Sequence, residues 1–414
     1  MINRPLLDPG ALEGVDLADP RLHAEYDLTE VWRHLRDTAP VHRHPATRRG
    51  DGFWVITRYD DVATVYKDGR LFSSERGNVL DTLLAGGDSA GGRMLAVTDG
   101  AHHTALRSVL NKHFTPRALE VIVDSLRTAT WKLIEDAVAK GEGDFAADVA
   151  ANIPLAAICD LLGVPQSDRA HILSLTPSAL ASSDGAPTEE GTWSAKNELL
   201  LYFSELAASR RAKPYDDVVS LLVTSEVGER PLSHEEIIFN CYSIIMGGNE
   251  TTRFAMIGGL LELMRNPEQW QALKSGQVSL ETAIEEILRY TTPSLHSGRT
   301  STEDCFLGGE FIEAGDIVTV WNASANRDER QFPDPDRFDL ARTPNKHLTF
   351  AYGPHFCIGA YLARAELNAV FGGLRAMAAD MWLTGEPRRI YANFLSGFAT
   401  LPVSFTPDPS FTGA

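Results

Sequence analysis

Apolar residues recur with helical spacing over most of the chain. From about residue 102 to residue 272 nearly every segment has this spacing, with turns at glycine-containing sites such as Gly141-Glu142-Gly143. A helix is also expected over 280–290, and another over the segment with apolar residues at 367, 370, 371, 374 and 377. Helices therefore dominate the predicted fold.

The longest predicted helix begins near Ser233, where Glu236 three residues later completes a capping box. It should run to about Arg265, before Asn266-Pro267. Gly247-Gly248 interrupts it, and each Gly costs about 1 kcal/mol relative to Ala in a helix interior. The pair indicates either close helix packing or a ligand that crosses the helix here, and the four polar residues at 249–252 favour a ligand.

Strand patterns are few and short. We expect a helix over 26–38, a strand over 53–57, a helix from about residue 59, strands over 306–307 and 311–312 flanking Gly308-Gly309, and strands over 317–321 and 401–405. Two segments, 76–99 and 182–192, have the composition of long loops, which are usually functional or mobile in a compact chain. The pattern predicts a mainly α fold with small β-sheets.

Composition restricts the class of protein. The chain has 414 residues, 43% hydrophobic and 23% charged, which excludes collagen-like and mostly disordered chains. Its 38 Lys and Arg against 56 Asp and Glu give a net charge of −18, which disfavours nucleic acid as a partner. No apolar run reaches the roughly 20 residues of a membrane span, and residues 1–30 lack the pattern of a signal peptide. Small molecules or proteins are the expected partners.

The four cysteines, at 159, 241, 305 and 357, form no C-x-x-C pair, which indicates a reducing compartment and a cytoplasmic protein. Cys357 follows a Gly/Pro turn just before the last long helix, where free N–H groups and the helix dipole would favour its thiolate. Gly359 leaves space for the close approach of a flat ligand. The alternative for any lone cysteine is a small buried hydrophobe, which we expect for the other three.

The segment Phe350-Ala351-Tyr352-Gly353-Pro354-His355-Phe356-Cys357-Ile358-Gly359 resembles the haem-binding signature of the cytochromes P450, and the resemblance extends over essentially the whole chain. It implies a P450 fold in a single domain over 1–414, with haem b between the long central helix and the cysteine loop. Cys357 would be the axial thiolate ligand of the iron, Phe350 the aromatic beside it, and His355 a donor to a haem propionate. Ala351 stands where the family usually has Gly, and a methyl should fit there if the local backbone is unstrained.

Further positions match the family. His103 and Arg107, four apart on one helical face, would by themselves indicate a solvated face, but the resemblance implies that they clamp haem propionates together with Arg299. Glu286 and Arg289 match the structural ion pair of the family, which Arg337 is expected to complete. His296 is a weaker candidate, since a histidine at the start of a strand can simply be packed.

The segment Gly247-Gly248-Asn249-Glu250-Thr251-Thr252 resembles the family motif that crosses the haem. The resemblance implies that Gly248 contacts the cofactor and that Glu250 and Thr251 are catalytic, the acid and the hydroxyl that deliver protons. Gly247 stands where Ala is frequent and should enlarge the space beside the iron, and Asn249 stands where His is often found. Either difference could equally be neutral.

The implied activity is that of a haem-thiolate monooxygenase, which activates dioxygen and hydroxylates or otherwise oxidises a small, largely apolar molecule. Because the sequence contains no flavin or nicotinamide fingerprint, we expect electrons from NAD(P)H to arrive through a separate ferredoxin and ferredoxin reductase. The ferredoxin should dock on a local basic face near Cys357. The protein itself is expected to be a monomer.

The resemblance places an apolar substrate pocket at Leu83, Leu84, Met246, Gly247, Leu295, Phe394 and Leu395, although such residues are also ordinary core. Tailoring of a secondary metabolite is the expected role. The alternatives are a carrier-protein-bound amino acid or acyl chain, and a free polyketide, steroid or terpene.

Other classes of haem protein remain as alternatives. A haem sensor, an electron carrier, a catalyst of oxidative coupling or a peroxygenase would not need Glu250 and Thr251 in the long helix. Their presence favours dioxygen activation.

Overall fold

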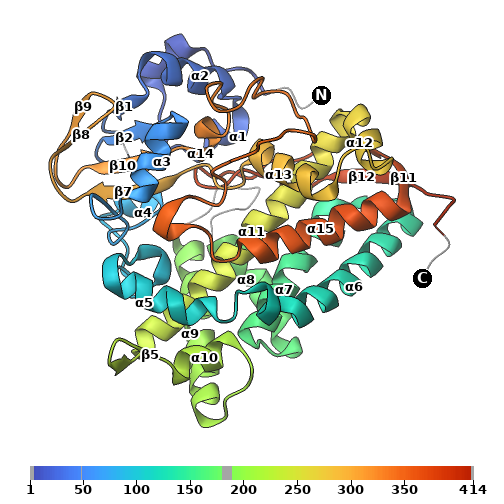
Figure 1. Ribbon diagram of the computed structural model, residues 1–414, viewed down its shortest axis with the longest axis horizontal. Coiled ribbons are helices and arrows are strands. Elements are labelled where there is room, and N and C mark those ends of the chain that lie inside the picture. The colour runs from blue at the N-terminus through green and yellow to red at the C-terminus, as the bar shows by residue number, and fades with distance from the viewer. Residues whose placement is uncertain (1–3, 48, 180–188, 412–414) are drawn as a thin grey trace.

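The computed structural model describes residues 4–47, 49–179 and 189–411. Helices make up most of this part of the chain, and the long helix α11 (His234–Arg265) crosses its middle, with α15 (Ala360–Met377) and α6 (Pro116–Lys140) packed against each other on one side (Figure 1). The main sheet lies on the other side, beside the N-terminal helices. This arrangement confirms the mainly α fold with small sheets.

The remaining α-helices have these bounds: α1 (Pro20–Glu25), α2 (Thr29–Thr38), α3 (Tyr59–Lys67), α4 (Leu80–Leu84), α5 (Gly100–Asn111), α7 (Asn152–Leu162), α8 (Arg169–Ala179), α9 (Glu189–Ala212), α10 (Val218–Thr224), α12 (Pro267–Lys274), α13 (Leu280–Thr291) and α14 (Asn322–Ala325). Short 3-10 turns η1 (Pro9–Gly14), η2 (Leu95–Val97), η4 (Gln166–Asp168) and η5 (Gly353–His355) and a π turn η3 (Ala146–Ala150) connect them.

The main sheet has the strand order β1-β2-β10-β7-β3. Its strands are β1 (Val41–His44), β2 (Phe53–Ile56), β3 (Phe72–Ser73), β7 (Ser297–Ser301) and β10 (Ile317–Val320). Neighbouring strands are antiparallel except β2 and β10, which pair in parallel with Val318 opposite Trp54. The sheet therefore joins the N-terminal part to the segment just after α13.

The other sheets are smaller. A three-stranded sheet has the order β11-β12-β4, with β4 (Glu142–Asp144), β11 (Ala378–Leu383) and β12 (Pro402–Pro407); two hairpins pair β5 (Glu226–Val227) with β6 (Arg230–Pro231) and β8 (Cys305–Leu307) with β9 (Glu310–Ile312). In the β8–β9 hairpin Leu307 lies opposite Glu310 across Gly308-Gly309, as the sequence predicts.

The capping box sets the start of α11. The Ser233 hydroxyl accepts from the backbone N–H of Glu236 at 3.1 Å, and the Glu236 carboxylate accepts from the N–H of Ser233 at 2.7 Å. The helix ends before Pro267, which has no N–H to continue it. The predicted boundaries of the longest helix are therefore confirmed.

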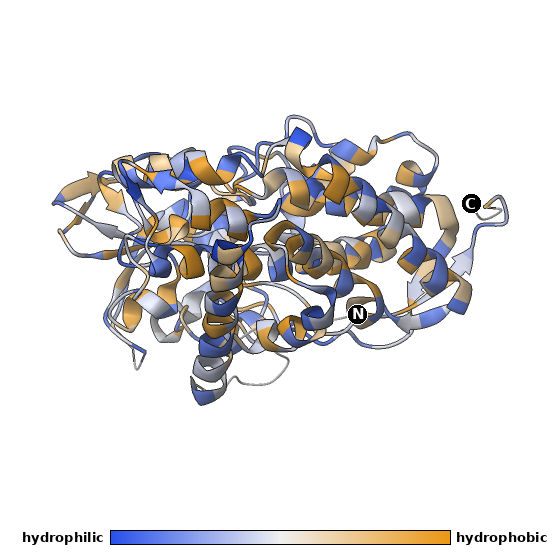
Figure 2. Ribbon diagram, turned by 90° about the horizontal axis from the view of Figure 1, so that it is seen from below, coloured by the Kyte–Doolittle hydropathy of each residue, from blue (hydrophilic) through white to orange (hydrophobic). Residues whose placement is uncertain are grey.

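Apolar side chains of α11 form the centre of the largest core cluster. Phe254, Met256, Ile257 and Leu260 are each 0–1% exposed. Figure 2 shows hydrophobic and hydrophilic residues alternating along the same helices, as expected when one face of each helix is buried. The second half of α11 is therefore packed into the centre of the core.

Several local predictions need correction. The segment 76–99 is largely irregular, but Leu80–Leu84 forms the helix α4, and the predicted turn at Gly141 leads directly into the strand β4. The helix expected from residue 26 begins at Thr29, because Asp27 accepts the backbone N–H of Thr29 at 2.9 Å. Residues 182–188 of the predicted loop 182–192 lie outside the described residues, and residues 189–192 begin the helix α9 instead of continuing a loop. Within the described ranges, no helix has both the length and the apolar character to cross a bilayer.

Candidate active site

The loop that carries Cys357 is held by its backbone. The N–H of Cys357 donates to the carbonyl of Phe350 at 2.9 Å, which closes the loop over eight residues. Gly353 has φ +69°, and a side chain there would meet the carbonyl oxygen of Tyr66 at 2.7 Å. The helix α15 begins at Ala360 with Gly359 as its cap, so Cys357 lies just before the helix as expected.

The surroundings of the Cys357 thiol act in opposite directions on its pKa. The residue is exposed, yet the protein atoms around its thiol raise its pKa above the ordinary value by desolvation. The backbone N–H of Gly359 and the charges of Arg107 and Arg364 lower the pKa, but by less than desolvation raises it. The expected N–H donor is therefore present next to the thiol.

Ala351 adopts a left-handed backbone conformation with φ +59°. A residue with a Cβ in this region is strained by about 1–2 kcal/mol relative to right-handed conformations. The condition under which a methyl would fit without cost, an unstrained backbone, is therefore not met. The side chain itself packs beside the sheet core.

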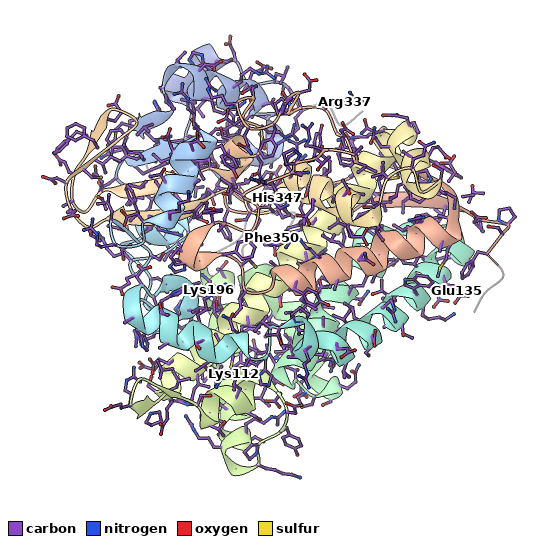
Figure 3. The ribbon with its side chains drawn as sticks, viewed as in Figure 1. Lys112, Glu135, Lys196, Arg337, His347 and Phe350 are labelled. Carbon is purple, nitrogen blue, oxygen red and sulfur yellow. The ribbon has the colours of Figure 1, made fainter. Side chains whose placement is uncertain are left out.

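Phe350 is buried, with 9% of its surface exposed, and its ring lies 4.6 Å from the guanidinium carbon of Arg364. Arg364 in turn makes two hydrogen bonds to Glu285, at 2.6 and 2.8 Å. In Figure 3 Phe350 lies near the centre of the molecule, close to the start of α15. The aromatic side chain is therefore fixed against the cysteine loop by a charged pair that the sequence did not indicate.

The structure brings the four predicted propionate donors together. The imidazoles of His103 and His355 lie 4.4 Å apart, and Arg107 donates to the carbonyls of Pro354 and Phe356 at 3.2 and 2.5 Å. Arg299 is 3% exposed and lies 5.4 Å from the ring of Tyr66. Burial lowers the pKa of His355 most, and the charges of Arg299 and Arg107 lower it further, against the hydrogen bond to Asp99.

The cluster of His103, Arg107, Arg299 and His355 has more positive than negative groups, so it could bind a ligand with two negative charges. Asp99 accepts from His355 at 2.8 Å, but Nε2 of His103 is buried without a hydrogen-bond partner. Burial, and then repulsion by His355 and Arg107, lower the pKa of His103 to about 4. Carboxylates placed here would give Nε2 a partner and balance the arginines, so the residues fit the two propionates of haem.

The two glycines of α11 do different things. A methyl on Gly247 would have no atom within 4 Å, and the residue is exposed. A methyl on Gly248 would lie 2.5 Å from Cδ1 of Ile158, which belongs to α7. Open space for a ligand therefore lies at Gly247, and the missing side chain of Gly248 serves the close helix packing that was the alternative interpretation of the pair.

Thr251 and Glu250 follow on the same helix. The Thr251 hydroxyl donates to the carbonyl of Gly247 at 2.9 Å, one turn earlier, at the open space. The Glu250 carboxylate is 1% exposed and accepts from Arg253 at 3.4 Å and from Asn249 at 3.3 Å. A buried acid beside an alcohol that faces open space is an arrangement suited to proton transfer.

The structural ion pair of α13 is present with a different third member. Arg289 and Glu286 are both fully buried and make two hydrogen bonds of 2.8 Å. Arg342, not Arg337, adds a third contact, with its Nε 3.2 Å from Glu286. Arg337 is exposed, in the upper right part of Figure 3, and offers only its backbone carbonyl to Arg289, so its predicted role was wrong.

His296 is a packed histidine. Its Nε2 accepts from the N–H of Leu80 at 3.2 Å, and its Nδ1 faces the carbonyl of Asn393 at 3.2 Å. Its ring packs against Trp321 and Phe394, with centroids 4.8 and 5.6 Å away. The ring therefore links its own segment to those of Leu80 and Asn393, and both of its nitrogens are used in these contacts.

The predicted pocket residues divide into two groups. Leu295 and Leu395 line a cavity of about 530 Å³, and a bridge joins Ser294 to Leu395. The other residues have different neighbours. Leu83 packs against Gly298, next to Arg299, and Leu84 packs against Gly50. Phe394 packs against His296, and Met246 is buried next to the open space at Gly247. The structure thus brings only part of the predicted pocket into one cavity.

Sequence reasoning did not identify Asp99, Tyr66 or Arg364 as parts of the site. Asp99 lies immediately before α5, which carries His103, and binds His355 across 256 positions. Tyr66 donates to Asn322 at 2.9 Å and lies under Arg299. No local pattern marks any of them, since their partners come from distant segments.

Comparison with known proteins gives a consistent result. Residues 278–374 match the family described as cytochrome P450. The chain is 50% identical to "Cytochrome P450 NovI" of Streptomyces niveus over 98% of this chain and all of the relative, and 33% identical to "Steroid C26-monooxygenase" of Rhodococcus jostii (strain RHA1) over 96% and 86%. The crystal structure of "P450 OxyD that is involved in the Biosynthesis of Vancomycin-type Antibiotics" superimposes with a TM-score of 0.86 at 32% identity, covering 95% of this chain and 100% of that one.

Proposed function

Because the chain belongs to the cytochrome P450 family and is a haem-dependent monooxygenase, we propose that Cys357 is the axial ligand of its haem iron. When bound, the thiolate-ligated haem activates dioxygen and supplies one oxygen atom to the substrate. The main support for these residue assignments is the cluster of basic side chains. In it, His103 has a buried nitrogen without a hydrogen-bond partner next to His355, Arg107 and Arg299. These four side chains hold the propionates, and Phe350 and Gly359 flank the sulfur.

Thr251 and Glu250, both on α11, hold the protons that the reaction needs. The Thr251 hydroxyl is anchored on the carbonyl of Gly247 and can orient a water in the open space there. Glu250 is buried next to Thr251 in the sequence, and Arg253 and Asn249 hold its carboxylate in place, so it is the acid of the proposed relay. This pair distinguishes the proposal from a haem sensor or an electron carrier, which need no proton delivery.

Electrons are proposed to come from NAD(P)H through a separate ferredoxin and its reductase. Three aromatic side chains around the cysteine loop, Tyr352, Phe356 and Tyr361, are each at least 40% exposed. Lys67 lies 5.0 Å from the ring of Tyr352, and the exposed Lys112 follows α5, which carries Arg107. Exposed aromatics beside cations suit an acidic protein partner, even though the whole chain is acidic.

The substrate is proposed to be a small, largely apolar molecule of secondary metabolism. The likeness to OxyD, whose title places it in antibiotic biosynthesis, supports this class, and so does the apolar character of Met246, Leu295 and Leu395. A carrier-protein-bound amino acid or acyl chain, or a steroid, is the alternative, and the similarity to a steroid monooxygenase supports the latter.

We further propose that residues 1–414 act as one domain in the cytoplasm, as a monomer. The four propionate donors and Cys357 come from α5, β7 and the loop before α15, so folding of these distant segments is needed to complete a single cofactor site.

The proton relay is tested by the coupling of NAD(P)H oxidation to product. In Thr251→Ala, electrons should be diverted to hydrogen peroxide because the anchored hydroxyl is lost. In Thr252→Ala, whose hydroxyl is buried on another face of the same helix, coupling should stay at the level of the unmodified enzyme. Unchanged coupling in Thr251→Ala would show that Thr251 takes no part in proton delivery.

A further inference from the structure

A cavity of about 530 Å³ lies along the second half of α11, and its volume is typical of a small-molecule site. Phe254, Gly258 and Glu262 line it from α11, and Phe254 is three residues beyond Thr251. At 1.5 Å per residue, the cavity begins about 5 Å along the helix from the hydroxyl-bearing turn. Its other apolar walls are Leu295, Ile390, Leu395 and Phe398.

The rim of the cavity is charged, and most of its charges are matched. Arg33 pairs with Glu30 and Asp336 at 2.5 and 2.6 Å, and Arg327 pairs with Asp336 at 2.9 Å. Arg265 pairs with Glu262 at 2.8 Å. These groups balance each other without a ligand.

Three of the arginines that line the cavity lie close to two carboxylates. Arg4, Arg265 and Arg389 line it together with Asp27 and Glu262. Arg4 donates to the carbonyl of His23 at 2.7 Å, and Asp27 accepts from both the hydroxyl and the N–H of Thr29 at 2.7 and 2.9 Å. With Glu262 engaged by Arg265, one positive charge is left over.

That charge belongs to Arg389. Its Nε is buried and has no hydrogen-bond partner, and its guanidinium carbon lies 4.3 Å from the ring centroid of Phe398. Burial, and then repulsion by Arg4 and Arg265, lower the pKa of Arg389 to about 9, against the attraction of Asp27 and Glu262. A buried donor without a partner is costly, and a carboxylate acceptor would remove the cost.

We propose that this cavity binds a small apolar molecule that carries a carboxylate, with Arg389 as the group that holds the carboxylate. The apolar body packs against Phe254, Ile390 and Phe398. The carboxylate belongs either to the substrate itself or to a separate effector, and both sources share this chemistry.

The test is isothermal titration of the haem-loaded enzyme with 4-phenylbutyrate and with its uncharged analogue 4-phenylbutan-1-ol. Replacing Arg389→Met should weaken binding of the acid about tenfold or more and leave binding of the alcohol unchanged, because only the acid uses the guanidinium. The matched control Arg117→Met, an exposed arginine on α6, should change neither affinity. Equal affinity of the acid for Arg389→Met and the unmodified enzyme overturns the proposal, as does the absence of binding at millimolar acid.

A second variant protects the test against a folding defect. If Arg389→Met unfolds, Arg4→Met removes one of the cations next to Arg389, and it should weaken binding of the acid about threefold; an unchanged affinity then overturns the proposal. A shift of the haem Soret band on binding assigns the carboxylate to a substrate that reaches the haem, and binding without a shift assigns it to an effector. Failure of the proposed function would show instead in the carbon monoxide spectrum, which does not depend on Arg389.

Discussion

The imidazoles of His103 and His355 lie 4.4 Å apart with their planes tilted by 39°, yet only His355 has a carboxylate partner, Asp99 at 2.8 Å. Nε2 of His103 is buried and unpartnered. Of these two histidines, His355 is positioned by Asp99, whereas His103 has a free buried nitrogen; under the proposed function this nitrogen donates to a haem propionate.

Replacement of His103 should therefore loosen the haem. His103→Phe keeps the packing but removes the hydrogen bond to a propionate, and haem transfer to apomyoglobin should become about tenfold faster, since a hydrogen bond to a charged group is worth about 1.5–3 kcal/mol. His103→Gln retains an N–H donor and should stay within about threefold of the unmodified enzyme. Equal transfer rates for all three proteins would show that His103 does not contact the haem.

Ala351→Gly should stabilise the protein. The left-handed conformation with φ +59° strains alanine, and glycine adopts it freely, so the free energy of unfolding should rise by about 1 kcal/mol. Ala129→Gly, at an exposed position inside α6, is the matched control and should lower stability by about 1 kcal/mol. Urea unfolding of the haem-loaded proteins measures both, and destabilisation by Ala351→Gly would contradict the assigned strain.

In the structure Arg342 contacts Glu286 and Arg337 does not, a difference that the sequence does not reveal. Arg342→Leu removes a contact of 3.2 Å to a fully buried carboxylate and should cost about 2 kcal/mol of stability. Arg337→Leu changes an exposed side chain and should stay within about 0.5 kcal/mol. Thermal melts compare the two, and a larger loss in Arg337→Leu would reinstate the sequence-based assignment.

His296 predicts a specific dependence of stability on pH. Burial, and then the charge of His23, lower the pKa of His296 to about 3, below the ordinary value of 6.5. Between pH 6.5 and pH 3 the unfolded chain therefore binds a proton at His296 that the folded protein does not bind. The contribution of His296 to the free energy of unfolding is complete above pH 6.5 and is lost as the pH falls from 6.5 towards 3.

In His296→Gln, the fall in the free energy of unfolding between pH 6 and pH 4.5 should be less steep by about one proton, or about 1.4 kcal/mol per pH unit. The amide of glutamine can replace both hydrogen bonds, to Leu80 and Asn393, so the fold should be kept. Urea midpoints at several pH values give the slope, and parallel curves for the two proteins would show that His296 titrates normally in the folded state.

Some features could be predicted from the sequence because they depend only on residues that are close together in the chain. The capping box of Ser233 and Glu236 and the proline at 267 set both ends of α11 without help from the rest of the chain. The polar strand β7 (Ser297–Ser301) has no such signal, since its sequence does not alternate apolar and polar residues and the pairing with β10 comes from a distant segment.

The site shows the same limit. A motif identifies Cys357, but the identity of the third ion-pair member depends on how the irregular segment after Pro333 folds back, and this brings Arg342 rather than Arg337 to Glu286. The unpaired Arg389 is likewise visible only once Arg4 and Arg265 are placed around the same cavity.

The central claim is that Cys357 is the thiolate ligand of the haem, and the carbon monoxide difference spectrum of the reduced protein tests it most directly. The unmodified enzyme should show the red-shifted Soret band of thiolate-ligated haem. Cys305→Ser, at a half-buried cysteine away from the site, should keep this band, and Cys357→Ser should lose it. A reduced, carbon monoxide-bound enzyme without the red-shifted band, or a Cys357→Ser variant that retains it, would contradict the account.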